Sequence, residues 1–272
     1  MVLHTIQFLL RGWTPAARRC RMRRKLRDRI AVVTGASKGL GKAMALALAA
    51  EGARLALVSR DGGQLAAVAA EIAAAGGTAA VFPADVTSEE DVRRIEREIL
   101  ALYPKVNILI NNAGVNVRKP VVDFTLREWR RVMDTNVTAA FLMCRSFVPA
   151  MVGQGYGRIL NMTSIMSHVS LPGRIAYATS KTALLGMTRT LALELAPEAI
   201  TANGISPGPF ETEMNRSLID DPETNAQFLS AIPLGRWGKV AEIGHLAVYL
   251  CSEEAGFITG TDIVIDGGWT AR

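Results

Sequence analysis

Tyr177 and Lys181 are four residues apart, at the head of an apolar run that predicts a helix from about residue 177 to residue 197. Because residues i and i+4 lie one above the other on a helix face, the phenol and the ammonium are expected to be neighbours. An adjacent cation favours the phenolate and lowers the pKa of a tyrosine, toward the working pH at which general acid–base catalysis is most efficient. The hydroxyl of Ser164 could hold a carbonyl oxygen beside the pair. The spacing alone also fits an ordinary helix surface, so the surrounding elements decide its meaning.

Strands and helices alternate along the rest of the chain. Short apolar or β-branched runs predict strands at residues 30–34, 54–58, 78–82, 106–110, 158–162, 200–205 and 263–265. Longer runs predict helices at residues 42–51, 64–75, about 87–102, 126–151 (one or two helices), about 177–197 and 239–251. Such alternation builds right-handed βαβ units and a parallel sheet, and strands that are apolar throughout are typical of burial on both faces. The sequence therefore predicts an α/β fold with a doubly wound parallel (Rossmann-like) sheet and a single domain at residues 28–272.

Composition excludes several classes of protein. The chain has 272 residues, of which 49% are hydrophobic and 21% charged, as in ordinary globular domains. It has three cysteines, too few and too scattered for a disulfide framework or a zinc site, so we expect no metal and a reducing, cytoplasmic location. No apolar run reaches the length of a membrane span, so no membrane partner is expected.

The net charge of +6 belongs to the N-terminal segment. Residues 1–27 hold eight of the 31 Arg and Lys residues and no acid, which leaves 23 basic against 25 acidic residues in the rest of the chain. No nucleic-acid partner is therefore expected for the fold. Three interpretations of this basic extension are open: an organelle transit peptide, a disordered basic arm able to bind nucleic acid, or an upstream stretch that is not native if translation starts at Met22. The last interpretation is preferred.

A glycine-rich turn, Gly35-x3-Gly39-x-Gly41, separates the first strand from the first helix. At this position a dinucleotide pyrophosphate can rest on the helix N-terminus, with glycines that let the backbone approach it. The spacing departs from the G-x-G-x-x-G pattern, and such a turn can also merely pack helix on strand.

The end of the second strand indicates which dinucleotide is used. Ser59 stands where an acidic residue would bind the ribose 2′-hydroxyl of NAD, Arg60 follows it, and Lys38 precedes the second glycine of the turn. Two cations without an acid suit a 2′-phosphate, so the sequence predicts NADP(H) in preference to NAD(H). Asp61 is expected to cap the next helix.

These features together resemble the short-chain dehydrogenase/reductase family over residues 28–269. The matching pieces are Thr34-Gly-Ala-Ser-Lys-Gly-Leu-Gly41, Asp85-Val86, Asn111-Asn-Ala-Gly114, Asn136, Ser164, Tyr177-x3-Lys181, Pro207-Gly208, Thr212 and Asp266-Gly-Gly268. Each is modest alone, and their joint order and spacing are specific. The resemblance implies hydride transfer between a nicotinamide cofactor and a carbonyl or secondary alcohol.

The resemblance also implies a role for each matching residue. Tyr177 would exchange the proton with the substrate oxygen, Lys181 would lower the tyrosine pKa and bind the nicotinamide ribose, and Ser164 would orient the carbonyl. Asn136 would hold a water that links Lys181 to solvent. Asp85 would bind the adenine amino group, Pro207, Gly208 and Thr212 would seat the carboxamide, and Asn111 would be scaffold. The predicted cofactor contacts are Gly35, Ser37, Lys38, Gly39, Leu40, Gly41, Ser59, Arg60, Asp85, Val86, Asn112, Ala113, Gly114, Tyr177, Lys181, Pro207, Gly208 and Thr212.

Substrate and assembly follow from the same resemblance. A substrate lid is expected at about residues 209–238, and the chain resembles both gluconate 5-dehydrogenases, which act on sugar acids, and 3-oxoacyl-[acyl-carrier-protein] reductases. His168 is interpreted as a plain loop or pocket-wall residue and Arg118 as a solvated loop cation, although Arg118 could meet an anionic substrate. The family's usual homotetramer would pair residues 136–150 and 177–195 across subunits, with a second interface at 263–269. A non-catalytic nucleotide sensor or scaffold of the same fold is the alternative, and the complete catalytic set argues against it.

Overall fold

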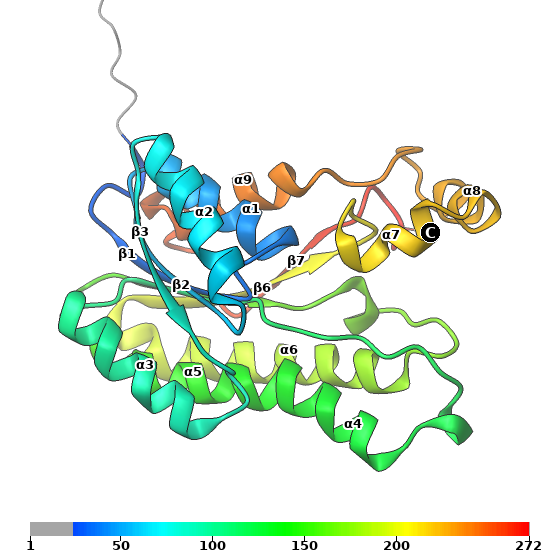
Figure 1. Cartoon of the computed structure of the whole chain (residues 1–272), viewed down its shortest axis with the longest axis horizontal. Coiled ribbons are helices and arrows are strands. Elements are labelled where there is room, and N and C mark those ends of the chain that lie inside the picture. Colours follow the sequence, from blue (N-terminus) through cyan, green and yellow to red (C-terminus); the bar gives the residue numbers. More distant parts are fainter. Residues whose placement is uncertain (1–23, 272) are drawn as a thin grey trace, which may run out of the picture.

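The computed structural model describes residues 24–271 and contains one parallel sheet covered by helices on both faces (Figure 1). The strand order is β3-β2-β1-β4-β5-β6-β7, and each neighbouring pair is parallel. The strands are β1 Ile30–Thr34, β2 Arg54–Ser59, β3 Thr78–Pro83, β4 Ile108–Asn111, β5 Gly157–Met162, β6 Ile200–Pro207 and β7 Asp262–Ile265. This confirms the predicted fold class. Residues 1–23 of the basic extension, Met22 among them, lie outside the described residues.

Two helical layers enclose the sheet. One face carries α1 Gly39–Ala50, α2 Gly62–Ala74 and α9 Val240–Cys251, and the other carries α3 Glu89–Leu102, α4 Leu126–Met133, α5 Ala139–Phe147 and α6 Ile175–Leu195 (Figure 1). Two further helices, α7 Arg216–Ile219 and α8 Pro222–Ala231, lie beyond the sheet on the side of the C-terminus. Among the helices of residues 24–271, none combines the length and apolarity needed to cross a bilayer.

The sheet divides the apolar core in two. Alternate residues of β1 belong to different clusters: Ala31 and Val33 pack with α1 and α9, whereas Val32 packs with α3 and α5. Every residue of β4 is buried. Period-two alternation sends successive side chains to opposite faces, so a strand covered on both faces must be apolar throughout. The apolar runs of β1 and β4 therefore predicted both strands from the sequence.

Apart from shifts of one to three residues in the bounds of several elements, the structure departs from the predicted elements in two places. The helical region predicted at residues 126–151 is α4 and α5 joined by a π-helical segment, Asp134–Thr138, that contains Asn136. The lid region carries α7 and α8, which were not predicted. The start of α8 nevertheless has a clear signal, because the Asp221 side chain accepts a hydrogen bond from the Thr224 N–H and Pro222 stands at the first position.

Candidate active site

The turn after β1 has the geometry of an anion-binding site. Gly35 and Gly39 have positive φ angles of 63° and 55°. A Cβ on Gly41 would lie 2.2 Å from the Gly35 carbonyl oxygen, so only glycine lets α1 start this close to the turn. The N-cap residue of α1, Lys38, makes no side-chain capping bond, so the first N–H groups of this 12-residue helix are available to a phosphate. These residues fit the pyrophosphate of a dinucleotide.

Asn112, at the end of β4, braces this turn. Its Nδ2 donates to the carbonyl oxygens of Thr34 at 2.9 Å and Gly35 at 3.2 Å. The Thr34 hydroxyl in turn accepts from the N–H groups of Asn112 and Ala113. The Asn-Asn-Ala-Gly stretch therefore fixes the shape of the glycine-rich turn, a role that sequence reasoning had not assigned to Thr34. Asn111 bonds to Asn161 and Cys144 inside the core, consistent with scaffold.

A cavity of about 890 Å³ runs along the carboxyl ends of the strands. The predicted cofactor residues line it with one exception, Gly41, which packs behind the turn. Its wall includes Gly35, Ser37, Lys38, Gly39, Leu40, Ser59, Arg60, Asp85, Val86, Asn112, Ala113, Gly114, Tyr177, Lys181, Pro207, Gly208 and Thr212. Ser164 also lines it, whereas Asn136 lies behind the wall.

Near the place predicted for the 2′-phosphate, Ser59, Arg60, Lys38 and Asp61 all line the cavity. Asp61 caps α2 by accepting from the Gln64 N–H at 2.9 Å, as the sequence predicted, so its carboxylate is used within the chain. The Lys38 ammonium lies 2.6 Å from Glu213 Oε2 of the lid. Both side chains are more than half exposed, so this ion pair is weak and a phosphate could compete for Lys38.

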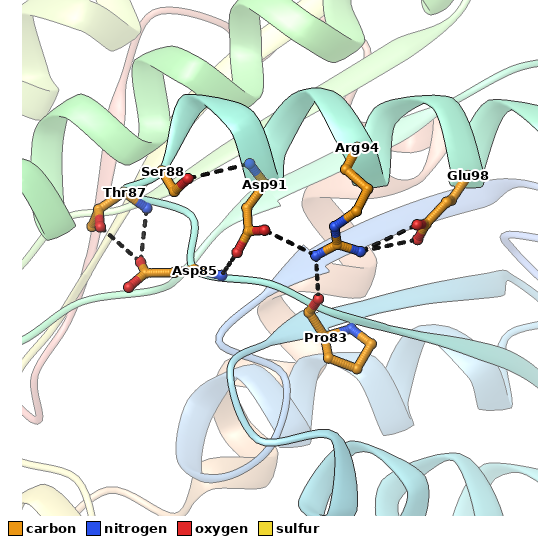
Figure 2. Close-up of polar contacts among 7 residues, drawn as sticks. All are labelled: Pro83, Asp85, Thr87, Ser88, Asp91, Arg94 and Glu98. Carbon is orange, nitrogen blue, oxygen red and sulfur yellow. Dashed lines mark hydrogen bonds and ion pairs between the residues drawn. The ribbon is translucent and has the colours of Figure 1, made fainter.

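The residue predicted to meet the adenine, Asp85, is held from two sides (Figure 2). Thr87 donates to its Oδ1 from both N–H and hydroxyl, at 3.0 and 2.7 Å. Asp91 on α3 accepts from the Asp85 N–H at 2.8 Å, and Arg94 joins Asp91 to the Pro83 carbonyl at the end of β3. The backbone N–H of Asp85 and the Arg94 guanidinium lower the pKa of the Asp91 carboxyl. The start of α3 therefore orients Asp85 toward the cavity.

The predicted catalytic side chains meet at the other end of the cavity. Lys181 is buried and its Nζ donates to the Met162 carbonyl oxygen at 2.5 Å. The same nitrogen lies 5.6 Å from the centre of the Tyr177 ring. Ser164 is buried just beyond β5, and its Oγ accepts from the Met166 N–H at 3.1 Å, which caps a short 3-10 turn at Ile165–Ser167. The first turns of α6 and the end of β5 thus bring all three groups together.

The pKa values of this group differ from the expectation for an isolated Tyr-Lys pair. Burial raises the pKa of Tyr177, and a hydrogen bond with Ser164, followed by the charges of Arg174 and Arg118, opposes that rise. The acidification of Tyr177 by Lys181, which the resemblance implies, stays a prediction. Burial instead lowers the pKa of Lys181 to about 8. Its ammonium donates to a backbone carbonyl rather than to the phenol.

Asn136 is fixed by three hydrogen bonds of its side chain. Its Oδ1 accepts from the Val115 N–H at 2.8 Å, and its Nδ2 donates to the Val115 carbonyl and to Ser180 Oγ. A Cβ on Gly114 would lie 3.3 Å from Asn136 Oδ1 and 3.6 Å from Lys181 Nζ, so these two residues flank the glycine. A π-helical turn often marks a functional position, and here it carries Asn136 toward Lys181. The side-chain amide of Asn136 is thus already hydrogen-bonded within the chain. The water predicted to link Lys181 to solvent would therefore need a hydrogen bond to the main chain as well.

Sequence reasoning gave no individual role to several residues of the cavity wall. Arg174, at the N-cap of α6, lines the cavity and lies near both Tyr177 and Arg118. Burial, and then the Arg118 charge, lower the pKa of Arg174. Phe228 of the lid and Trp269 near the C-terminus close the wall, with ring centres 5.5 Å apart. Among residues 24–271, no three His, Cys, Asp or Glu side chains converge as metal ligands would.

Comparison with known proteins gives a consistent assignment. A family model described as enoyl-(acyl carrier protein) reductase matches residues 35–270. A 3-oxoacyl-[acyl-carrier-protein] reductase of Aquifex aeolicus is 36% identical over 245 residues, which cover 90% of this chain and 98% of that protein. An NAD-dependent glycerol dehydrogenase of Listeria innocua is 36% identical over 247 residues, 90% of this chain and 95% of that protein.

The fold is also shared with a solved structure. A gluconate 5-dehydrogenase of Burkholderia cenocepacia, in complex with NADP and tartrate, superposes with a TM-score of 0.88 at 33% identity. The match covers 92% of this chain and 98% of that one.

Proposed function

The chain belongs to the short-chain dehydrogenase/reductase family, and from that premise we propose that it uses NADP(H) to interconvert a carbonyl and a secondary alcohol on a sugar acid or keto-sugar acid. The observation that carries the proposal is the convergence of Ser164, Tyr177 and Lys181 at one end of a cavity whose other end is a glycine-rich helix start. A non-catalytic sensor of the same fold is not favoured, because the relatives compared above are enzymes.

The side chains have distinct tasks in this reaction. When bound, the nicotinamide supplies or accepts the hydride. The Ser164 hydroxyl would hold the substrate oxygen, and the Tyr177 phenol would give that oxygen a proton during reduction or accept one during oxidation. Lys181, with Nζ bonded to Met162, would remain as a fixed cation beside the phenol. The Ser164 hydroxyl lies close enough to the Tyr177 phenol to lower its pKa, so a carbonyl oxygen between them would meet both donors.

Two guanidinium groups support an acidic substrate. Arg174 and Arg118 are close enough to affect each other and the Tyr177 phenol, and both have pKa values lowered by burial. Arg174 is half-buried in the cavity wall, whereas Arg118 is exposed and does not line the cavity. Two neighbouring cations without a carboxylate between them favour an anion, and a planar carboxylate fits the guanidinium fork. Arg118 is held by Asn215 Oδ1 at 3.3 Å, which connects it to the lid. The gluconate 5-dehydrogenase described above has tartrate, a dicarboxylate, bound with NADP.

A 3-oxoacyl thioester is the second candidate. The A. aeolicus relative is named as a reductase of 3-oxoacyl groups on acyl carrier protein. In this chain the cavity wall includes Met166, Leu171 and Phe228, which an acyl chain could contact. The arginine pair makes the acid the preferred substrate. For the cofactor, Ser59, Arg60 and Lys38 on one wall support NADP(H), although the L. innocua relative is NAD-dependent.

The proposal is tested by steady-state kinetics on a panel of gluconate, 5-keto-gluconate, glucose and an acetoacetyl thioester, each with NADP(H) and NAD(H). We expect the highest kcat/KM for a sugar acid with NADP(H), and little turnover of glucose, which lacks the carboxylate. A higher kcat/KM for the thioester would select the second candidate. Comparable kcat/KM for the two cofactors, or a preference for NADH, would contradict the cofactor assignment.

Tyr177→Phe separates chemistry from binding on the best substrate of that panel. Loss of a general acid–base group lowers kcat by roughly a hundred- to ten-thousandfold, whereas the dissociation constant for NADPH should stay within about twofold because the phenyl ring remains. Tyr249→Phe, on α9 of the opposite layer, is the matched control and should keep wild-type kcat. Retained turnover in Tyr177→Phe would refute the mechanism.

A further inference from the structure

A buried carboxylate that the proposed mechanism does not use lies behind the catalytic serine. The Asp262 side chain, on β7, is 9% exposed. Its Oδ1 accepts from the Thr163 hydroxyl at 2.5 Å, and its Oδ2 accepts from the Ser206 hydroxyl at 2.5 Å. Oδ2 also lies 2.6 Å from His168 Nε2, which must donate because a carboxylate only accepts.

The chain makes space for this carboxylate at a neighbouring strand. A Cβ on Gly204 of β6 would lie 2.0 Å from Asp262 Oδ1, so any other residue would displace the carboxylate. Thr163 and Ser206 are themselves buried, and their hydroxyl oxygens are 2.9 Å apart. Three donors from three segments satisfy the buried acid, which is the condition for placing a carboxylate in the interior without a large penalty.

Each donor stands next to a functional segment. Thr163 directly precedes Ser164, and Ser206 directly precedes Pro207 and Gly208, the predicted seat of the nicotinamide carboxamide. His168 ends the short turn capped by Ser164, and its N–H donates to the Ile165 carbonyl. Asp262 is therefore bonded to the residue before the serine, to the residue before the cofactor seat and to the turn of the cavity wall between β5 and α6.

We propose that Asp262 is a positioning residue that sets the distance between the Ser164 hydroxyl and the Pro207–Gly208 seat, through its bonds to Thr163, Ser206 and His168. The inference rests on the proposed function, since it concerns the geometry of the same site. It also assigns His168: the imidazole lies on the surface side of this network and fixes the turn, in line with a loop residue and not a catalytic base.

The test combines kinetics with a readout that needs no substrate. Asp262→Ala removes all three bonds and is expected to lower kcat by roughly ten- to a hundredfold, because small displacements of an orienting group are costly to the reaction. Asp262→Asn keeps one acceptor oxygen, and hydroxyl donors can rotate to accept from its amide, so kcat should be partly restored. KM for NADPH should change less than kcat in both variants.

The substrate-independent readout is the phenolate absorbance of Tyr177, taken as the difference between each protein and the same protein carrying Tyr177→Phe. The hydrogen bond with Ser164 lowers the pKa of Tyr177. Displacing Ser164 should therefore move this titration to higher pH in Asp262→Ala, in the same direction as in Ser164→Ala. Thr163→Val, which cuts one bond with little change of shape, keeps the test valid if Asp262→Ala does not fold, and should shift the titration in the same direction.

Thr188→Val is the matched control for stability. Its buried hydroxyl accepts from Asn161 of β5, the strand that leads to Ser164, but touches neither Asp262 nor the cavity wall. It should destabilise the fold and leave both kcat and the Tyr177 titration unchanged. An unmoved titration in Thr163→Val and in folded Asp262→Ala, or an equal shift in Thr188→Val, would overturn the positioning role. If the wild-type protein reduced no substrate of the panel, the proposed function would fail while the titration still decided the role of Asp262.

Discussion

The least ordinary environment of any titratable residue at the site belongs to Lys181. Its side chain is 4% exposed, and burial lowers the pKa of the ammonium to about 8. One backbone acceptor, the Met162 carbonyl, compensates for the lost hydration. A buried cation with one acceptor is unfavourable for the fold, so its presence at this place indicates a role in the chemistry.

Lys181→Met is expected to stabilise the cofactor-free protein while abolishing turnover. The pKa of Lys181 falls from 10.5 in the unfolded chain to about 8 in the fold, so between these values the unfolded chain binds more protons, and the free energy of unfolding rises with pH across that window. A neutral side chain removes this dependence. At neutral pH the gain is on the order of 2 kcal/mol, after allowance for the lost bond to Met162.

Urea unfolding of the wild type and Lys181→Met between pH 7 and about pH 10 measures this effect. Lys105→Met, at an exposed position, is the control and should follow the wild type. Parallel pH curves for the wild type and Lys181→Met would show that the ammonium is not buried as the structure describes.

At the scale of elements, the sequence predicted those features that depend on residues close together in the chain. The apolar runs of β1 and β4, the glycine-rich turn and the Asp61 cap are set by residues a few positions apart, and the structure has them where expected. The hydrogen bond of Lys181 to Met162, in contrast, joins residues 19 positions apart. The hydrogen bond between Thr163 and Asp262 joins residues 99 positions apart. Such contacts depend on strand order and register, which no local pattern encodes.

The same dependence on distant contacts explains why the helices of the lid and the π segment were not predicted. The α8 helix has a weakly amphipathic sequence, and its side of the cavity is fixed by Phe228 stacking on Trp237, with ring centres 5.3 Å apart. The π segment at Asp134–Thr138 follows from the bonds of Asn136 to Val115 and Ser180, which lie on other elements. Both features arise from packing against segments far away in the chain.

Asp91→Asn tests whether the start of α3 orients Asp85 for the cofactor. The amide keeps one oxygen for either the Asp85 N–H or Arg94, but not the charge that attracts Arg94 (Figure 2). KM for NADPH is expected to rise by roughly three- to tenfold with kcat nearly unchanged, because the adenine end binds substrate and transition-state complexes equally.

The control for Asp91→Asn is Arg93→Gln, which breaks an exposed pair with Glu89 on the same helix and should leave KM unchanged. Initial rates at varied NADPH and saturating substrate distinguish the two. A fall in kcat at constant KM would place the effect of Asp91 in the chemistry and contradict an orienting role at the adenine.

For the whole molecule, the strand order brings the functional segments to one edge. The glycine-rich turn follows β1, the Asn112–Gly114 stretch follows β4, Ser164 follows β5 and Gly208 follows β6, and these four strands are adjacent in the sheet. Since all are parallel, their carboxyl ends face the same side, beside the change of strand order between β1 and β4. Motifs that are far apart in the sequence therefore line one continuous cavity.

The outer layer of α5 and α6 predicts how copies of the chain associate. Leu193 on α6 is 80% exposed and Phe141 on α5 is 50% exposed, and both helices lie on the same face of the sheet (Figure 1). Exposed large apolar groups on adjacent helices are typical of an interface, as proposed here for a homotetramer. Leu193→Glu would place a charge in that interface and is expected to convert the tetramer into a smaller species.

Size-exclusion chromatography with light scattering measures this change across a range of protein concentrations. Leu102→Glu, at the end of α3 and 54% exposed, introduces the same charge away from α5 and α6 and should leave the tetramer intact. Far-ultraviolet circular dichroism confirms that each variant is folded. A wild-type monomer, or an undiminished tetramer in Leu193→Glu, would exclude this face as the contact, and the second proposed interface at residues 263–269, where Val264 is 40% exposed, would then be the one to test.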